Sequence, residues 1–192
     1  MIYPTGFSGL FVERLNSILN AYTYAWFSYI AIKDDEVSKV IAGKGSLLID
    51  GSFKLELADV IKIAREDPAK SSIDFMFFVL RAAIISFYEA FKGDADRYQC
   101  VMSESWFLLL ASLRQSVSHG IEGEWRSIKT VNGDSSFIYM RVNDGVELVF
   151  SKNMIGQPIN LEMATYIDIF QQAISFSKSK CSMPKTACAC SG

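Results

Sequence analysis

The chain has 192 residues, of which 50% are hydrophobic and 13% aromatic, enough apolar material to bury a core without disulfides or metals. Nineteen Lys and Arg side chains against 21 Asp and Glu side chains give a formal net charge of -2. This balance excludes attraction to nucleic acid through a global positive field, so any contact with RNA or DNA needs a local patch.

The sequence predicts neither a secreted protein nor a membrane protein. Its start, MIYPTGFSGL, lacks the basic segment, the apolar segment and the cleavage site of a signal peptide, so we expect a cytoplasmic protein. Residues 15–32 carry no charge but include several polar side chains, and residues 73–91 include Arg81 near their middle. Because a charge in hydrocarbon is costly, both segments favour buried helices over membrane spans.

The first third of the chain predicts three helices. Apolar residues at intervals of three and four predict a long helix over residues 7–32. The sequence DDEVSKVIAG predicts a short helix that Gly43 ends, with GKGSLLIDGS as the following loop. Residues 53–66 predict an amphipathic helix that ends at Asp67-Pro68, because a residue before proline avoids the α conformation.

The middle of the chain predicts two more helices. The first is expected to begin near Ser71 or Ser72 and to end near Phe91, with GDADRYQC behind it as a solvated turn. The second begins near Ser103 and is expected to end at Gly120. Its inner face is a single apolar stripe, formed by Trp106, Leu109, Leu110, Leu113 and Val117.

The pattern then changes to strands. Residues 136–142 and 146–150 are rich in β-favouring side chains and are joined by Asn-Asp-Gly, which is typical of a hairpin turn. An isolated hairpin is marginal in water, so we expect it to pack against helices or a partner. A last helix follows over about residues 160–177. The chain is thus predicted to be all-α, one helical domain over residues 1–180 with a β-hairpin insertion at 136–150.

Residues 181–192 are expected to be a disordered tail that contains Cys181, Cys188 and Cys190. Their C-x6-C-x-C spacing matches none of the usual zinc motifs, and the chain's one histidine is far away in the sequence. We therefore expect neither a metal nor a cofactor.

That histidine, His119, stands in LRQSVSHGIEG at the polar end of a predicted helix. Arg114 and Ser118 are i and i+4 neighbours, whereas Arg114 and His119 lie about 140° apart on a regular helix. A straight helix therefore does not aim both side chains at one small substrate. Either the helix unwinds before His119, or two chains meet across a twofold axis and build one site.

Metal-free cleavage of RNA through the ribose 2′-hydroxyl needs one group to take that proton and another to protonate the leaving oxygen. One chain supplies a single imidazole, so a dimer would supply the pair. Arg114 suits the remaining task, because a guanidinium can donate to two phosphate oxygens as negative charge develops on them.

At these residues the chain resembles the HEPN superfamily, helical domains marked by R-x4-6-H, often with Asn, Asp or His directly after the arginine. RQSVSH is R-x4-H, in which Arg114 matches the motif arginine, His119 the motif histidine and Gln115 the polar position. The resemblance implies a HEPN-like up-and-down helical bundle and a metal-independent endoribonuclease. Such proteins usually act as homodimers whose motif helices face each other, often as toxins or as antiphage or abortive-infection effectors.

In this interpretation His119 transfers protons, Arg114 orients or stabilises the scissile phosphate, and RNA binds at the dimer cleft. Gln115 and Ser118 are expected to support them. Trp125 and Arg126 follow the motif and are candidates for stacking a base and binding a phosphate, although Trp125 equally fits a place over the core.

Two other functions stay open. His119 also fits a helix-terminal residue that bonds the last carbonyls, and Arg114 fits an ordinary ion-pair partner. The chain would then be a non-catalytic HEPN-like interaction protein, such as an antitoxin-like partner or a nucleotide-binding subunit. A structural or regulatory protein whose hairpin over residues 136–150 docks a partner edge to edge is the remaining possibility. A toxin or effector, for its part, implies an antitoxin or defence-system partner.

Overall fold

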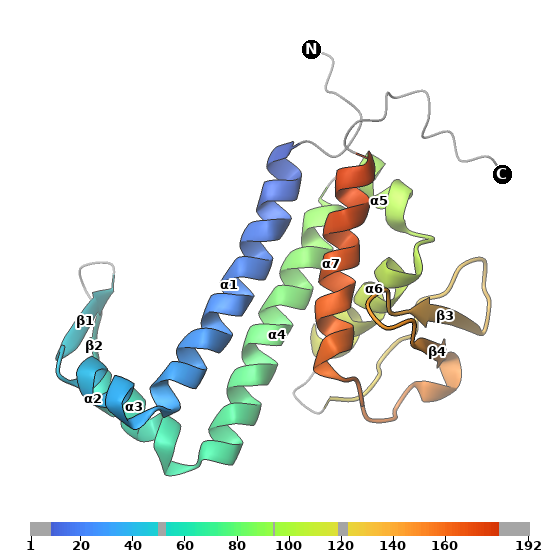
Figure 1. Ribbon diagram of the computed structural model, residues 1–192. Helices are drawn as coiled ribbons and strands as arrows, with labels where there is room; N and C mark the ends of the chain where they lie inside the picture. The colour runs from blue at the N-terminus through green and yellow to red at the C-terminus, as the bar shows by residue number, and fades with distance from the viewer. Residues whose placement is uncertain (1–8, 50–52, 94, 119–122, 181–192) are drawn as a thin grey trace. The chain divides into compact units, whose positions relative to one another are not determined.

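The computed structural model describes residues 9–49, 53–93, 95–118 and 123–180 (Figure 1). These residues are mostly helical and include two separate two-stranded antiparallel sheets. They divide into two compact units, one from the described residues within 20–80 and one from the described residues within 9–19 and 81–180. Helices α1 (Gly9–Lys33) and α4 (Pro68–Lys92) each contribute residues to both units.

The unit of residues 20–80 contains α2 (Asp35–Ala42), the hairpin β1 (Ser46–Ile49) and β2 (Phe53–Glu56), and α3 (Leu57–Glu66). Asp34 begins α2, as its carboxylate accepts the backbone N–H groups of Glu36 and Val37 at 3.0 Å each. The rings of Tyr29 and Phe75 stack with centroids 4.6 Å apart, which packs α1 against α4 within this unit.

Two predictions for this unit are wrong. The expected loop at residues 43–52 contains β1, and the expected helix over 53–66 begins only at Leu57, because its first four residues form β2. The physical reason lies in the sequence: Leu47-Leu48-Ile49 favours a strand, and Asp50-Gly51 is hairpin-turn chemistry.

Two helix starts also differ from prediction. Helix α4 begins at Pro68 rather than near Ser71 or Ser72. Proline is favoured at the first position of a helix, because the N–H group that it lacks would have no hydrogen-bond partner within the helix there. The expected solvated turn at residues 93–100 is largely a seven-residue helix, α5 (Ala95–Val101). Predictions for the short helix α2 and for the end of α3 before Asp67-Pro68 are confirmed.

In the second unit, the start of α1, the end of α4 and α7 (Met163–Lys180) run side by side in Figure 1. Ring contacts join them: Phe11 meets Phe91 at 5.1 Å between centroids, and Phe87 stacks on Phe170 at 4.4 Å. Helix α6 (Ser105–Ser118) is buried at every residue from Trp106 to Leu113. The core therefore surrounds this part of the helix on all sides, whereas the predicted apolar stripe covers only one side.

The predicted second hairpin is confirmed as β3 (Ser136–Met140) and β4 (Glu147–Ser151), followed by the short 3-10 helix η1 (Lys152–Met154). Its register runs from Ser136 opposite Ser151 to Met140 opposite Glu147. Tyr139 and Phe150 are buried on its inner face, and β3 contacts α6, so the hairpin packs against the helices as expected. The predicted tail lies outside the described residues, and the division of the chain into one domain and a tail stays a prediction.

Within the described ranges, no helix has both the length and the apolar character that crossing a bilayer requires.

Candidate functional site

The predicted site begins at the last turns of α6, where the helix emerges from the core. Arg114 keeps 29% of its side chain exposed, and its Nη2 lies 2.9 Å from the Glu89 Oε1. Its guanidinium carbon lies 5.4 Å from the centroid of the Tyr88 ring. Since Glu89 and Tyr88 both belong to α4, a carboxylate and an aromatic face hold the guanidinium on the α4 side of α6.

Tyr88 offers this guanidinium a neutral ring. Burial raises the pKa of the Tyr88 hydroxyl above its usual range, and the neighbouring Tyr98 raises it further, while Arg114 opposes the change. The hydroxyl therefore stays protonated at physiological pH. The contact between Arg114 and Tyr88 is accordingly a cation–π contact rather than an ion pair.

The structure leaves part of the predicted site undescribed. His119 lies outside the described residues, and so does the side chain of Ser118. Gln115 is half-buried beside Arg114 in α6. The composite site of Arg114 and His119 therefore stays a prediction, in which the arginine is the member with known surroundings.

On another face of α6, two buried serines hold the segment that follows the motif. Ser112 Oγ accepts the backbone N–H of Lys129 at 2.8 Å, and Ser116 Oγ accepts that of Arg126 at 3.0 Å. Positions 114 and 116 differ by about 200° around a regular helix. The structure therefore brings the exposed Arg126 to α6, but on the face nearly opposite Arg114.

Trp125 belongs to the core, so its expected role in stacking a base is wrong. Its side chain is 0% exposed, and its ring meets that of Phe150 at 5.5 Å between centroids. The backbone N–H of Trp125 donates to Gln157 at 2.9 Å, and its carbonyl accepts from Gly156 at 2.8 Å. Complete burial leaves no face of the ring open to a base.

A buried polar network, which the sequence did not indicate, joins the hairpin to α7. The Asp168 carboxylate is buried and accepts the Tyr139 hydroxyl, the Gln172 amide at 2.7 Å and the Val142 N–H at 3.1 Å. Burial, followed by the contact with Asp168, raises the pKa of Tyr139 far above its usual range. The only signal in the sequence was an acid between two isoleucines of the last helix.

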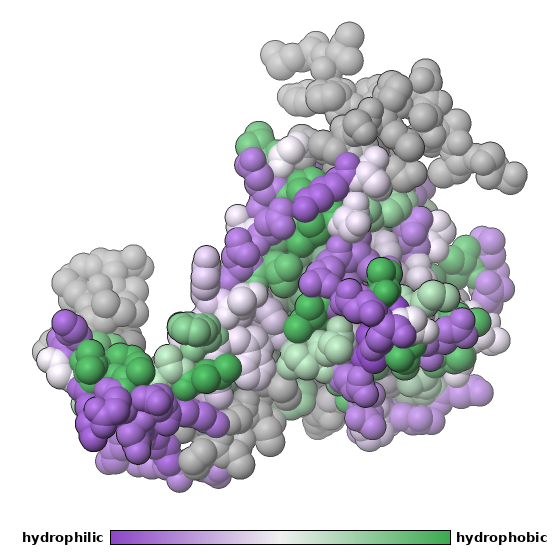
Figure 2. Space-filling view, viewed as in Figure 1, coloured by the Kyte–Doolittle hydropathy of each residue, from purple (hydrophilic) through white to green (hydrophobic). Residues whose placement is uncertain are grey.

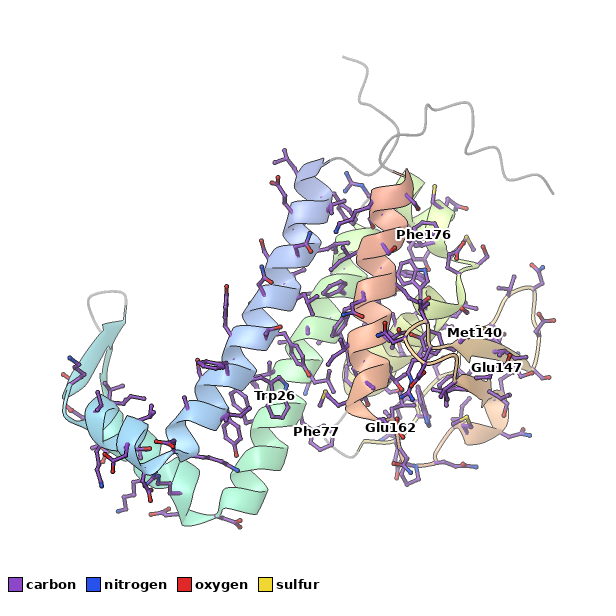
Figure 3. The ribbon with its side chains drawn as sticks, viewed as in Figure 1. Trp26, Phe77, Met140, Glu147, Glu162 and Phe176 are labelled. Carbon is purple, nitrogen blue, oxygen red and sulfur yellow. The ribbon has the colours of Figure 1, made fainter. Side chains whose placement is uncertain are left out.

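Arg141 extends this network to the start of α7. Its side chain is 8% exposed and lies 2.6 Å from the carboxylate of Asp144 and 2.6 Å from that of Glu162, which Figure 3 labels. The hydrogen bond from Arg141 lowers the pKa of Asp144. Because two carboxylates engage Arg141 and three donors engage Asp168, we assign the network a structural role: it fixes the hairpin on α7.

Within the described ranges, no group of three His, Cys, Asp or Glu side chains is arranged to hold a metal ion, and the three tail cysteines lie beyond those ranges. The chemistry visible at the end of α6 is that of a guanidinium held in place beside solvent. No protein-family model, curated protein or solved structure matches the chain.

Proposed function

We propose that the chain is a HEPN-type, metal-independent endoribonuclease that acts as a homodimer, with Arg114 and His119 as its catalytic residues. The position of Arg114 carries this proposal. Five residues before the one histidine of the chain, the guanidinium is held between Glu89 and Tyr88 and still reaches solvent. A group that meets phosphate must be both positioned and accessible.

In the proposed reaction, His119 of one copy takes the proton of a ribose 2′-hydroxyl. The 2′-oxygen attacks phosphorus, and the bond from phosphorus to the 5′-oxygen breaks. His119 of the second copy gives its proton to that leaving oxygen. The products are a 2′,3′-cyclic phosphate and a 5′-hydroxyl, while Arg114 donates to the non-bridging oxygens as their charge grows.

The test is cleavage of labelled RNA by the purified chain in the presence of EDTA. We expect His119→Ala to slow cleavage by about 10²- to 10⁴-fold, the usual contribution of a general acid or base. We expect Arg114→Ala to slow it by about 10²- to 10³-fold, as the loss of an oxyanion donor does. Absence of cleavage by the parent chain, or full activity of His119→Ala, would overturn the proposal.

Arg65→Ala is a matched control for Arg114→Ala. Arg65 Nη2 lies 2.8 Å from the Asp35 Oδ1, and 37% of its side chain is exposed, close to the 29% of Arg114. Both substitutions delete a partly exposed ion pair, which contributes about 1 kcal/mol or less to stability, and Arg65→Ala also removes a hydrogen bond of 2.8 Å to the Ser38 Oγ, so it is the more demanding control for folding. Only the Arg114 substitution should therefore slow cleavage.

A non-catalytic HEPN-like interaction protein, such as an antitoxin-like partner, is the second candidate function. The observation in its favour is Glu89, which already compensates the charge of Arg114. In such a protein the ion pair only helps to fasten α6 to α4. Cells would then tolerate expression of the chain, whereas the nuclease is expected to impair growth unless His119 is replaced.

A further inference from the structure

The β3–β4 hairpin has an outer edge on each strand. Arg141 N donates to Val146 O, and Lys152 N donates to Ser135 O, both at 2.9 Å. These bonds mark hydrogen-bonded pairs at the two ends of the ladder, and such pairs alternate with non-hydrogen-bonded ones. The backbone groups of Glu147, Val149 and Ser151 therefore point away from β3.

Helix α7 occupies part of the β3 edge. Gln172 Nε2 donates to the carbonyl of Met140 at 3.0 Å, and the N–H of Val142 donates to Asp168 at 3.1 Å. The edge of β4 differs, because in the part of the chain that the structure describes this sheet has two strands only. Val149 at its centre is 62% exposed.

The outer face of the hairpin carries few of the charges that usually protect an edge strand. Ile138 and Val149 lie directly opposite each other and are 58% and 62% exposed, and Met140 beside them is 52% exposed. Figure 2 shows hydrophobic side chains among hydrophilic ones over the hairpin, and Figure 3 shows Met140 beside Glu147. Charged side chains, proline or a bulge normally discourage pairing at an edge, and between Glu147 and Ser151 β4 has one charge, Glu147 at its first residue, and neither proline nor a bulge.

We propose that β4 pairs antiparallel with β4 of a second copy of this chain, in the register centred on Val149. The outward backbone groups of Val149 then form a hydrogen-bonded pair with those of the other Val149. Glu147 lies opposite Ser151 of the second copy. The result is a four-stranded sheet whose outer face has a continuous apolar stripe, built from Ile138 and Val149 of both copies.

The side chains select this register among those that symmetry allows. Centring the pair on Glu147 would place two glutamates directly opposite each other, which is destabilising. Centring it on Ser151 would place Val149 opposite Asn153, in η1 and beyond the end of the strand, and centring it on Phe150 would place Glu147 there. Centring it on Leu148 would place Ser151 opposite Gly145, in the hairpin turn. The Val149 register alone pairs every outward residue of β4 without opposing like charges.

This dimer involves neither Arg114 nor His119, so it stands independently of the proposed nuclease. Its test is the mass of the full chain in solution, measured by sedimentation over a range of concentrations. We expect association through β4 that Val149→Lys weakens at least tenfold, because two lysines would oppose each other at the centre. This association gives a dimer where β4 is the sole interface, and a tetramer that Val149→Lys reduces to a dimer where the nuclease dimer forms as well. Val142→Lys is the matched control on another exposed valine of the hairpin, 70% exposed, and is expected to leave the dimer unchanged.

Two substitutions of opposite charge at Ser151 test the register of the pairing. Ser151→Glu would oppose Glu147 of the second copy and should weaken the dimer several-fold, whereas Ser151→Lys would complement it and should tighten the dimer. These variants also keep the test valid if Val149→Lys fails to fold. A chain that stays monomeric up to millimolar concentration would overturn the inference. So would a dimer that responds equally to Val149→Lys and Val142→Lys, or equally to the two Ser151 substitutions.

Discussion

Replacing Asp168 by alanine should loosen the β3–β4 hairpin from α7. The substitution removes an acceptor from the Tyr139 hydroxyl, from the Val142 N–H at 3.1 Å and from the Gln172 amide at 2.7 Å. Asp168 is 1% exposed, so water does not readily replace its carboxylate. The Gln172 amide keeps the carbonyl of Met140 at 3.0 Å as an alternative acceptor, whereas the other two donors lose the acceptor recorded for them.

The expected loss follows mainly from the Tyr139 hydroxyl, which is buried, because Val142 is 70% exposed and water can replace the acceptor of its N–H. A buried donor left without an acceptor costs about 1–3 kcal/mol, so we expect Asp168→Ala to reduce the free energy of opening this region by about 2 kcal/mol. Since 1.4 kcal/mol corresponds to a factor of ten, amide hydrogen exchange in peptides that cover residues 136–151 should accelerate roughly thirtyfold.

Gln171→Ala is the control on the same helix. Gln171 is exposed and accepts one hydrogen bond, from Asn143 at 3.1 Å, so its loss should change stability by less than about 0.5 kcal/mol. Asp168→Asn keeps the shape and one acceptor oxygen and should fall between the two. Equal exchange rates in Asp168→Ala and Gln171→Ala would refute the assignment of Asp168 as the anchor of the hairpin.

Two further predictions concern the same unit. Ser112→Ala deprives the Lys129 N–H of its acceptor at 2.8 Å, so it should lower the free energy of unfolding, measured in urea, by about 1–2 kcal/mol. The same substitution at the exposed Ser175 should have little effect. Similar losses in the two variants would contradict the role of Ser112 in holding the segment that contains Lys129. Burial and Asp168 raise the pKa of Tyr139, so the folded state favours the protonated hydroxyl. Its contribution is complete below about pH 10, the pKa of an unfolded tyrosine, and is lost as the pH rises further. Tyr139→Phe should weaken this alkaline loss in unfolding measurements, and an unchanged pH dependence would count against the shift.

The sequence predicted the elements whose ends have local chemical signals. Asp34 begins α2 and Gly43 ends it, and Asn-Asp-Gly marks the turn between β3 and β4. The sequence did not predict the β1–β2 hairpin, because the apolar residues of 53–66 fit a helical spacing throughout. Residues 53–56 form a strand rather than the start of a helix because they pair with β1. Local periodicity does not distinguish a short strand from the first turn of a helix.

Among the residues of the predicted site, the partial exposure of Arg114 is what the local pattern predicts correctly. Arg114 stands where α6 emerges from the core, as expected, but Glu89 is 25 positions earlier in the chain and only the packing of α4 on α6 reveals it. Trp125 was a candidate for stacking a base because it follows the motif in the sequence, but its ring is buried. Closeness to a motif in the sequence does not reveal whether a side chain is exposed. Asp168 looks like any helix-face acid until the hairpin lies over it.

A comparison of two arginines shows why Arg114 remains the better candidate for meeting phosphate. Arg141 is 8% exposed and lies 2.6 Å from each of two carboxylates that fix the hairpin turn. A phosphate could recruit it only by dismantling that support. Arg114 is 29% exposed, and its ion pair with Glu89 is of the solvent-exposed kind that contributes about 1 kcal/mol or less. In the proposed reaction, the phosphate would replace Glu89 at the cost of this ion pair, while the Tyr88 ring keeps the guanidinium in place.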